Sequence, residues 1–354
     1  EQDWSRTLEE ISTGIVSIRV DSTRAFDTSW NSSSQASGFV VDAKNGLILT
    51  NRHVVTSGPV IAEAVFLNNE EVRLTPVYRD PVHDFGFFRY QPKELKHIKP
   101  VELVLAPESA NVGESIRIIG NDSGEQLSIL DGTLARVDRK APDYGRGNYN
   151  DFNTVYFQAS SGTSGGSSGA PVVNINGEVI ALNAGANNSS ASSFFLPLNR
   201  IKRALGLLQK QQPIERGSLQ SEFVIDTFDE LSRLGLSNET EMLVRTHNKD
   251  LFGMLVAKFI VPASPASGKI KPGDILVRIN GKLVTDFLEF ASIIDNKVGE
   301  VISVELERSG RIIKEMIEVT DLNTITPDTF LQFGDAVVHN LSYQQVRHLN
   351  RPLK

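Results

Sequence analysis

The N-terminal part of this chain is a series of short apolar runs separated by polar turns, and this pattern constrains the fold more than any other feature. Many short strands at this spacing are typical of an all-β barrel or sandwich. The dipeptide Asn176-Gly177 between the last two runs is a hairpin signal. Before the strands we expect a helix at Trp4–Ile15, with Trp4 packed within its own chain. The expected strands are Phe39–Asp42, Leu47–Thr50, Ile61–Phe66, Val72–Arg79, Phe85–Tyr90, Ser115–Ile119, Leu127–Val137, Val155–Ala159, Val172–Ile175 and Val179–Leu182.

The pattern changes after the polar segment Lys210–Ser218, where strands begin to alternate with helices. The run Ile270–Gly281 reads as a turn, a strand and a tight turn, and Asp286–Asp295 reads as a helix. A hairpin around Ser309-Gly310 completes the pattern. The sequence therefore predicts a second, smaller α+β domain.

The composition excludes several classes of function. The net charge of −7 argues against sequence-independent binding of nucleic acid, because such binding needs an excess of positive charge. Without cysteine the chain has neither disulfides nor thiol chemistry. No apolar stretch approaches the length of a membrane span, and no signal peptide is visible. We expect no metal, no cofactor, no nucleic acid and no membrane as partners.

Residues Gly166–Pro171, which read Gly-Ser-Ser-Gly-Ala-Pro, carry the strongest chemical signal. They fit the turn that presents the nucleophile in serine proteases of the chymotrypsin architecture. Gly166 allows the backbone to turn so that its own N–H and that of Ser168 converge on one point, which forms an oxyanion hole. The alternative is a flexible linker, because Ser160–Gly169 is almost entirely Ser and Gly.

A nucleophilic serine needs a base, and His53 is the best candidate among the six histidines. It follows the apolar strand Leu47–Thr50, so the sheet holds it while its side chain faces a cleft. We interpret the other histidines as solvated or satisfied within the fold; they are His83, His97, His247, His339 and His348.

The base needs an orienting carboxylate, for which Asp84 and Asp80 compete. Asp84 opens a short apolar strand, where it is shielded from water and within reach of an imidazole. Asp80 precedes Pro81 and belongs to the turn itself. We favour Asp84, and the resulting chain order of His, Asp and Ser is that of the chymotrypsin class.

Several stretches together resemble the HtrA (Deg) family of proteases, and within it a large nuclear type known from fungi. They occur in the expected order, and the run Ile270–Gly281, which is similar to a segment of the PDZ fold, extends the resemblance over essentially the whole chain. The stretches are Ala36–Val41, Gly46–Val55, Tyr78–Phe87, Gly120–Gly124, Tyr149–Thr154, Gly165–Val172 and Phe194–Leu198.

The resemblance implies a mainly β fold, in which a chymotrypsin-like double β-barrel is followed by an α+β PDZ domain. We expect the trypsin/chymotrypsin-like protease domain at residues 1–211, a linker at 212–222 and the PDZ domain at 223–321. Residues 322–354 then form a tail toward a second protease–PDZ half, because the large type carries two such halves in tandem.

The same resemblance implies a serine endopeptidase that cleaves unfolded or partner proteins through an acyl-enzyme. Ser168 is the expected nucleophile, His53 the base and Asp84 its orienting acid, with the oxyanion hole at Gly166 and Ser168. The expected setting is nuclear protein quality control or pro-apoptotic proteolysis, by a protein that forms homo-oligomers. The alternative is a protein-binding, chaperone-like module with an idle protease fold.

A substrate pocket without charge is expected, because Gly162 stands where trypsin-like enzymes carry the acid that selects basic residues. Phe194 and Phe195 are candidates for its apolar wall, although at least one of them can face the core. Such a pocket favours small or medium apolar residues, since it cannot offset the desolvation of a charge.

By resemblance, the loop that holds a peptide carboxylate in the PDZ domain is Leu234-Gly235-Leu236. A strand should follow this loop, yet Asn238–Arg245 reads as a capped helix. Binding of a peptide ligand by this domain therefore remains open.

Overall fold

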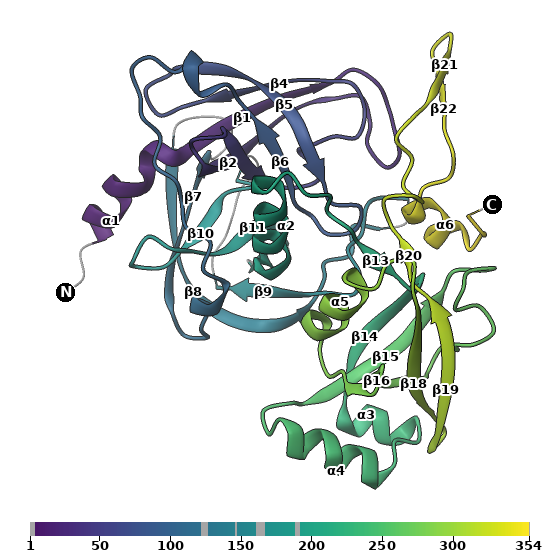
Figure 1. Ribbon diagram of the computed structural model, residues 1–354. Coiled ribbons are helices and arrows are strands. Elements are labelled where there is room, and N and C mark those ends of the chain that lie inside the picture. The colour runs from purple at the N-terminus through teal and green to yellow at the C-terminus, as the bar shows by residue number, and fades with distance from the viewer. Residues whose placement is uncertain (1–3, 122–126, 146, 161–166, 188–191, 354) are drawn as a thin grey trace. The chain divides into compact units, whose positions relative to one another are not determined.

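A computed structural model describes residues 4–121, 127–145, 147–160, 167–187 and 192–353 (Figure 1). The described residues pack into two compact units. The first unit is drawn from Glu1–Pro142, Val155–Pro213 and Gln332–Val337, and the second from Asp143–Thr154, Ile214–Leu331 and Val338–Lys354.

The first barrel of the first unit closes in the strand order β1-β2-β3-β6-β5-β4. Along β1, Val16, Ile18 and Val20 are buried and alternate with the more exposed Ser17 and Arg19, which is the two-residue period of a strand with one face in a core. The strands are β1 (Ile15–Ser22), β2 (Ser33–Asp42), β3 (Leu47–Thr50), β4 (Val60–Val65), β5 (Glu71–Arg79) and β6 (Gly86–Arg89).

The second barrel closes in the order β10-β11-β12-β9-β8-β7, so the described residues confirm the expected double β-barrel. Its core includes Ile116, Val172, Ile180 and Phe195. The strands are β7 (Ser115–Asn121), β8 (Leu127–Lys140), β9 (Val155–Ala159), β10 (Pro171–Val173), β11 (Val179–Asn187) and β12 (Ser192–Pro197). Helix α2 (Asn199–Gln209) follows the last of them, and short 3-10 turns lie at Ser12–Gly14, Pro92–Glu94 and Pro107–Ser109.

The N-terminal helix α1 (Trp4–Ile11) packs on its own unit, as the sequence predicts. The Arg117 guanidinium lies over the Trp4 ring, 4.4 Å from its centroid. The Thr7 hydroxyl donates to the Ile175 carbonyl at 2.7 Å. Both contacts join the helix to the second barrel.

The second unit contains a sheet with the order β14-β15-β16-β18-β19, in which β14 is an edge strand. Helix α5 begins where the Asp286 side chain accepts from the Glu289 N–H at 2.8 Å, and its Phe290 ring lies 5.3 Å from that of Phe223 on β14. The elements are β13 (Gly217–Ser218), β14 (Ser221–Thr227), α3 (Phe228–Arg233), α4 (Asn238–His247), β15 (Gly253–Ile260), β16 (Ile275–Ile279), β17 (Lys282–Leu283), α5 (Phe287–Asp295), β18 (Val301–Arg308), β19 (Arg311–Glu318) and β20 (Thr320–Asp321).

The last residues form a short hairpin of β21 (Leu331–Phe333) and β22 (Ala336–Val338), then helix α6 (Tyr343–Leu349). Ser342 starts α6 with a capping box. Asp143–Thr154, which connects β8 to β9 along the chain, packs with the second unit and not with the barrels. The sequence pattern did not indicate that this connecting segment packs with the second unit.

Among the described residues, none of the helices is both long enough and apolar enough to cross a membrane. Nor do these residues include a group of three or more His, Asp or Glu side chains arranged to hold a metal ion.

Candidate active site

His53 lies in the turn that follows β3, and 45% of its side chain is exposed. The strand ends at Thr50. The turn is closed by the N–H groups of Val54 and Val55, which both donate to the Asn51 carbonyl. Because β3 is buried and the turn is short, the imidazole is anchored by the barrel and still reaches the surface.

The Asp84 carboxylate orients this imidazole through its Nδ1 atom. Nδ1 of His53 lies 3.0 Å from Oδ1 and 2.9 Å from Oδ2 of Asp84, and the His53 backbone N–H donates to Oδ1 at 3.1 Å. Since an ionised carboxylate only accepts hydrogen bonds, Nδ1 carries the proton and Nε2 is the basic nitrogen. The pair has the geometry of a general base with its orienting acid.

The charge state of Asp84 follows from the same contacts. Burial by itself raises the pKa of this carboxyl, whose side chain is only 4% exposed. The charge and hydrogen bonds of His53, together with the charge of Arg52, outweigh burial and bring the pKa of Asp84 below its ordinary value of 3.8. Asp84 is therefore ionised at neutral pH.

Asp80 holds the turn that leads to Asp84 and does not orient the imidazole. Its carboxylate accepts from the Tyr78 hydroxyl at 2.9 Å and from the N–H groups of Val82 and His83 at 2.9 and 2.6 Å. These bonds explain why a carboxylate stands at this buried position, and they separate its role from that of Asp84.

Behind His53 lies a buried ionic cluster that sequence reasoning missed. Arg52 Nη2 lies 3.3 Å from Oδ2 of Asp27, and Arg79 Nη1 lies 3.6 Å from the same atom. Arg52 Nε also donates to the Asp80 carbonyl at 2.7 Å. The cluster thus ties the segment of Asp27 to the turns that carry His53 and Asp84. Nothing local in the sequence pairs these residues.

The turn of Ser168 is joined by its backbone to Ser37 of β2, and Ser37 is bonded in turn to Thr50 at the end of β3. The Ser168 carbonyl accepts from the Ser37 N–H at 2.8 Å, and the Thr50 hydroxyl donates to the Ser37 carbonyl at 2.8 Å. Gly169 has φ +82°, and a Cβ there would lie 2.2 Å from the Ser37 carbonyl oxygen and 2.3 Å from the Thr50 Oγ1. Only glycine fits this approach.

Asn183 on β11 fixes the other side of the same turn. The Gly169 N–H donates to the Asn183 carbonyl at 2.9 Å, and the Asn183 side chain donates to the Ser167 carbonyl at 2.8 Å. The Ser168 Oγ lies 3.5 Å from the Ala184 carbonyl oxygen. Within the described residues, Ser167–Gly169 are therefore held in a defined turn, which favours the serine turn over the linker alternative.

The predicted substrate pocket is tested only in part. Gly162 and the oxyanion residue Gly166 lie outside the described residues. Phe195 is fully buried in the core of the second barrel, which corrects its assignment to a pocket wall. Phe194 is 5% exposed and lies beneath the Arg139 guanidinium, 5.1 Å from it. Its place in a pocket remains a prediction.

The structure also corrects the expected carboxylate loop at Leu234, Gly235 and Leu236. These residues form the turn between α3 and α4, and their N–H groups all donate to carbonyls of α3. No N–H of this turn is left for a ligand. The helix expected after it is present as α4, where the Ser237 side chain accepts from the Thr240 N–H.

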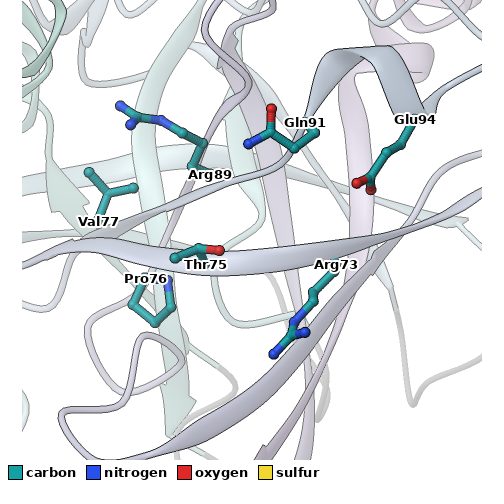
Figure 2. A pocket seen from close by; sticks show the side chains of 7 residues that line it. All are labelled: Arg73, Thr75, Pro76, Val77, Arg89, Gln91 and Glu94. Atoms are coloured by element: carbon teal, nitrogen blue, oxygen red, sulfur yellow. The ribbon is translucent and has the colours of Figure 1, made fainter.

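One surface hollow lies away from these residues, on the outside of the first barrel (Figure 2). It has a volume of about 430 Å³ and lies over β5, β6 and the turn after β6. None of His53, Asp84 and Ser168 contributes to it. Its lining residues are Arg73, Thr75, Pro76, Val77, Arg89, Gln91 and Glu94.

Comparison with known families identifies both units. The trypsin-like peptidase domain matches residues 36–182, and the PDZ domain matches residues 259–308. The HtrA-type protease AlgW with decapeptide has a similar fold, with a TM-score of 0.64 over 90% of this chain and 98% of AlgW, at 18% identity.

Two of the most similar sequences cover nearly the whole chain. Protease Do-like 7 of Arabidopsis thaliana is 51% identical over 99% of the chain. Pro-apoptotic serine protease nma111 of Aspergillus terreus is 48% identical over 98% of it. The chain spans about a third of the length of each, 33% in both cases. With its paired His53 and Asp84, its serine turn and these relatives, the chain belongs to the HtrA/Deg family of trypsin-like serine proteases with a PDZ domain.

Proposed function

We propose that this chain is a serine endopeptidase that hydrolyses peptide bonds of unfolded or partner proteins. Ser168 Oγ attacks the scissile carbonyl carbon while Nε2 of His53 takes its proton. The proton then passes to the leaving amine nitrogen as the C–N bond breaks. His53 next deprotonates a water molecule, which attacks the acyl-enzyme and restores Ser168. The N–H groups of Gly166 and Ser168 stabilise the oxyanion.

One observation supports this proposal: the turn of His53 follows β3, and the turn of Ser168 is bonded to β2, the neighbour of β3 in the first barrel. Asp84 holds His53 at 2.9 Å, and the Ser168 backbone is bonded to Ser37, which is bonded in turn to Thr50 of β3. Fixing base and nucleophile on two paired strands of one barrel supplies the pre-organisation that acyl transfer needs.

Labelling with a fluorophosphonate probe and cleavage of unfolded casein test the proposal. Ser168→Ala removes the nucleophile, so labelling disappears and cleavage falls by about 10³-fold or more. Ser167→Ala is the matched control, because it removes the adjacent hydroxyl, which accepts from Asn183 at 3.3 Å, and it is expected to keep labelling and most activity. Equal cleavage by the native chain and Ser168→Ala refutes the proposal. Suppressed aggregation without cleavage would indicate a chaperone-like module instead.

We further propose that the residue before the cleaved bond is small to medium and apolar. The support is the absence of charged residues between Val179 and Asn199, together with Gly162. Profiling of cleavage sites in a denatured proteome tests this preference. A majority of sites after Lys or Arg would contradict it.

The biological setting is proposed from the relatives' names and from the family. Fungal relatives are named pro-apoptotic serine proteases, which supports a role in regulated proteolysis or protein quality control. We propose a nuclear location and a homo-oligomeric assembly for the whole protein. Imaging of the tagged protein and light scattering test these two points.

A further inference from the structure

The free edge of β14 is the place in the second unit where another strand can add. Among the described strands, β14 pairs with β15 alone. The Gln220 carbonyl, just before β14, accepts from Val261 on the β15 side at 2.9 Å. Because peptide groups alternate sides along a strand, Ser221 and Phe223 turn theirs toward the free edge. PDZ domains bind extended peptides by adding a strand to such an edge.

The side chain of Asn153 makes, on this edge, the bonds that an added strand would make. Its Nδ2 donates to the Ser221 carbonyl at 3.0 Å, and its Oδ1 accepts from the Phe223 N–H at 2.7 Å. One carboxamide thus satisfies a donor and an acceptor of the strand at once. A peptide backbone cannot reach these two groups while Asn153 is in place.

Helix α6 holds the segment of Asn153 against the strand. The Gln344 side chain pairs in the same way with the Asn150 backbone, accepting from its N–H at 3.3 Å and donating to its carbonyl at 2.9 Å. The Phe152 ring stacks on that of Tyr343 at 5.3 Å, and the Arg347 guanidinium lies over Phe152 at 4.0 Å.

The same helix also contacts β14 directly. The Arg347 guanidinium pairs with the carboxylate of Glu222 and donates to the Asn150 carbonyl at 2.9 Å. Arg347 therefore joins three pieces of chain that are distant in sequence, and Phe152, which it covers, is only 8% exposed. The arrangement is a buried contact between segment, helix and strand.

The turn that precedes β14 is also occupied. The Gly217 N–H donates to Oδ1 of Asp295 at 2.9 Å, and the Gln220 N–H donates to the Ser218 hydroxyl at 2.8 Å. PDZ domains use the N–H groups of the loop before this strand to hold the terminal carboxylate of a ligand. Here side chains of the same unit take two of these groups.

We propose that the free edge of β14 is a docking surface whose resident ligand is the chain's own segment Asn150–Asn153, held there by α6. A peptide of another protein adds to this edge only after the segment leaves. The occupied edge is thus the resting state of the chain. The apparent affinity for a peptide equals the intrinsic affinity multiplied by the fraction of molecules in which the edge is open.

Hydrogen–deuterium exchange of the full chain tests the docked state. Asn153→Ala removes the acceptor of the Phe223 N–H, so we expect that amide to exchange at least about 10-fold faster. Gln344→Ala removes the two hydrogen bonds between α6 and the Asn150 backbone, and we expect it to raise exchange at the Phe223 amide as well. Asn148→Ala is the matched control, because that side chain lies just before the segment and donates to the Tyr144 carbonyl at 2.7 Å instead of to β14. Unchanged exchange at Phe223 in both test variants overturns the proposal.

Peptide capture tests the consequence. The probe is a synthetic library of decapeptides of random sequence with free C-terminal carboxylates, offered to the native chain and to the three variants. We expect Asn153→Ala and Gln344→Ala to retain peptides with about 10-fold higher affinity than the native chain and Asn148→Ala. Strong capture by the native chain, with no higher affinity in Asn153→Ala and Gln344→Ala, overturns the proposal. Failure of both variants to capture any peptide also overturns it. Folding of each variant is checked by its thermal unfolding midpoint.

Discussion

Replacement of Asp84 by Asn isolates the electrostatic part of the site, because the two side chains have the same shape. Asp84 accepts both the backbone N–H and the Nδ1–H of His53. Asn has one acceptor oxygen and an NH₂ group that only donates. If the oxygen keeps the backbone bond, the NH₂ group faces Nδ1. The imidazole then takes the tautomer with its proton on Nε2 and cannot receive the proton of Ser168.

The expected cost follows from this change of tautomer. A histidine held in the wrong tautomer in a Ser-His-Asp site loses about 10⁴-fold in turnover, which corresponds to about 5.5 kcal/mol of transition-state stabilisation. We expect ground-state binding to change little, since Asp84 is buried, with 3% of the residue exposed. The loss therefore appears in kcat, with little change in KM.

Initial rates of casein cleavage measure this effect, with Ser168→Ala and the double variant alongside. The rate losses caused by substitutions within one catalytic unit are not additive. The double variant should therefore be no slower than Ser168→Ala alone. An Asp84→Asn enzyme within about 10-fold of the native rate would falsify the assignment of Asp84 as the orienting acid.

The lowered pKa of Asp84 also predicts an acid limit. Its folded-state pKa lies below the unfolded value of about 3.9. The stabilisation by this carboxylate is fully present above that pH and is lost as the pH falls through the folded-state value. Unfolding midpoints measured from pH 7 to pH 3 should therefore fall more steeply for the native chain than for Asp84→Asn. Parallel curves contradict the pairing with His53.

Three further variants test the structure around the site. Gly169→Ala places a Cβ 2.2 Å from the Ser37 carbonyl oxygen, so both fluorophosphonate labelling and thermal stability should fall; a fully labelled, equally stable variant contradicts the geometry. Asp27→Ala leaves Arg52 buried without its carboxylate and should lower the free energy of unfolding by about 3–5 kcal/mol in urea titration, whereas a loss below about 1 kcal/mol contradicts the buried pair. Burial raises the pKa of Tyr90 to about 12, so native stability should decline as the pH rises from about 10 to 12; Tyr90→Phe should lose less over that range, and an equal decline refutes the role of this phenol.

Local patterns in the sequence determined the architecture and the chemical groups of the site. Many short strands separated by polar turns predict an all-β barrel or sandwich, and the family resemblance implies the double barrel. His53 could be found because it follows an apolar strand, Asp84 because it opens one, and Ser168 because its turn needs glycine. These signals depend on residues that are close in sequence.

Local signals misled where one pattern fits two structures. Leu234-Gly235-Leu236 resembles a ligand-binding loop, but Gly235, with φ +93°, ends helix α3, where a left-handed glycine is common. Phe194 and Phe195 are adjacent in β12, and the sequence alone did not decide how far either faces the core. Closure of the barrel buried Phe195 in it.

Only the tertiary structure decided which distant residues meet. The bond between Ser168 and Ser37, the pairing of Asp27 with Arg52 and the docking of Asn153 on β14 each join segments that no local pattern relates. Such contacts depend on barrel closure and on the path of the segment between β8 and β9, so they form only once the chain has folded. The physical reason is that hydrogen bonds and ion pairs are short-ranged, and folding alone brings their partners within reach.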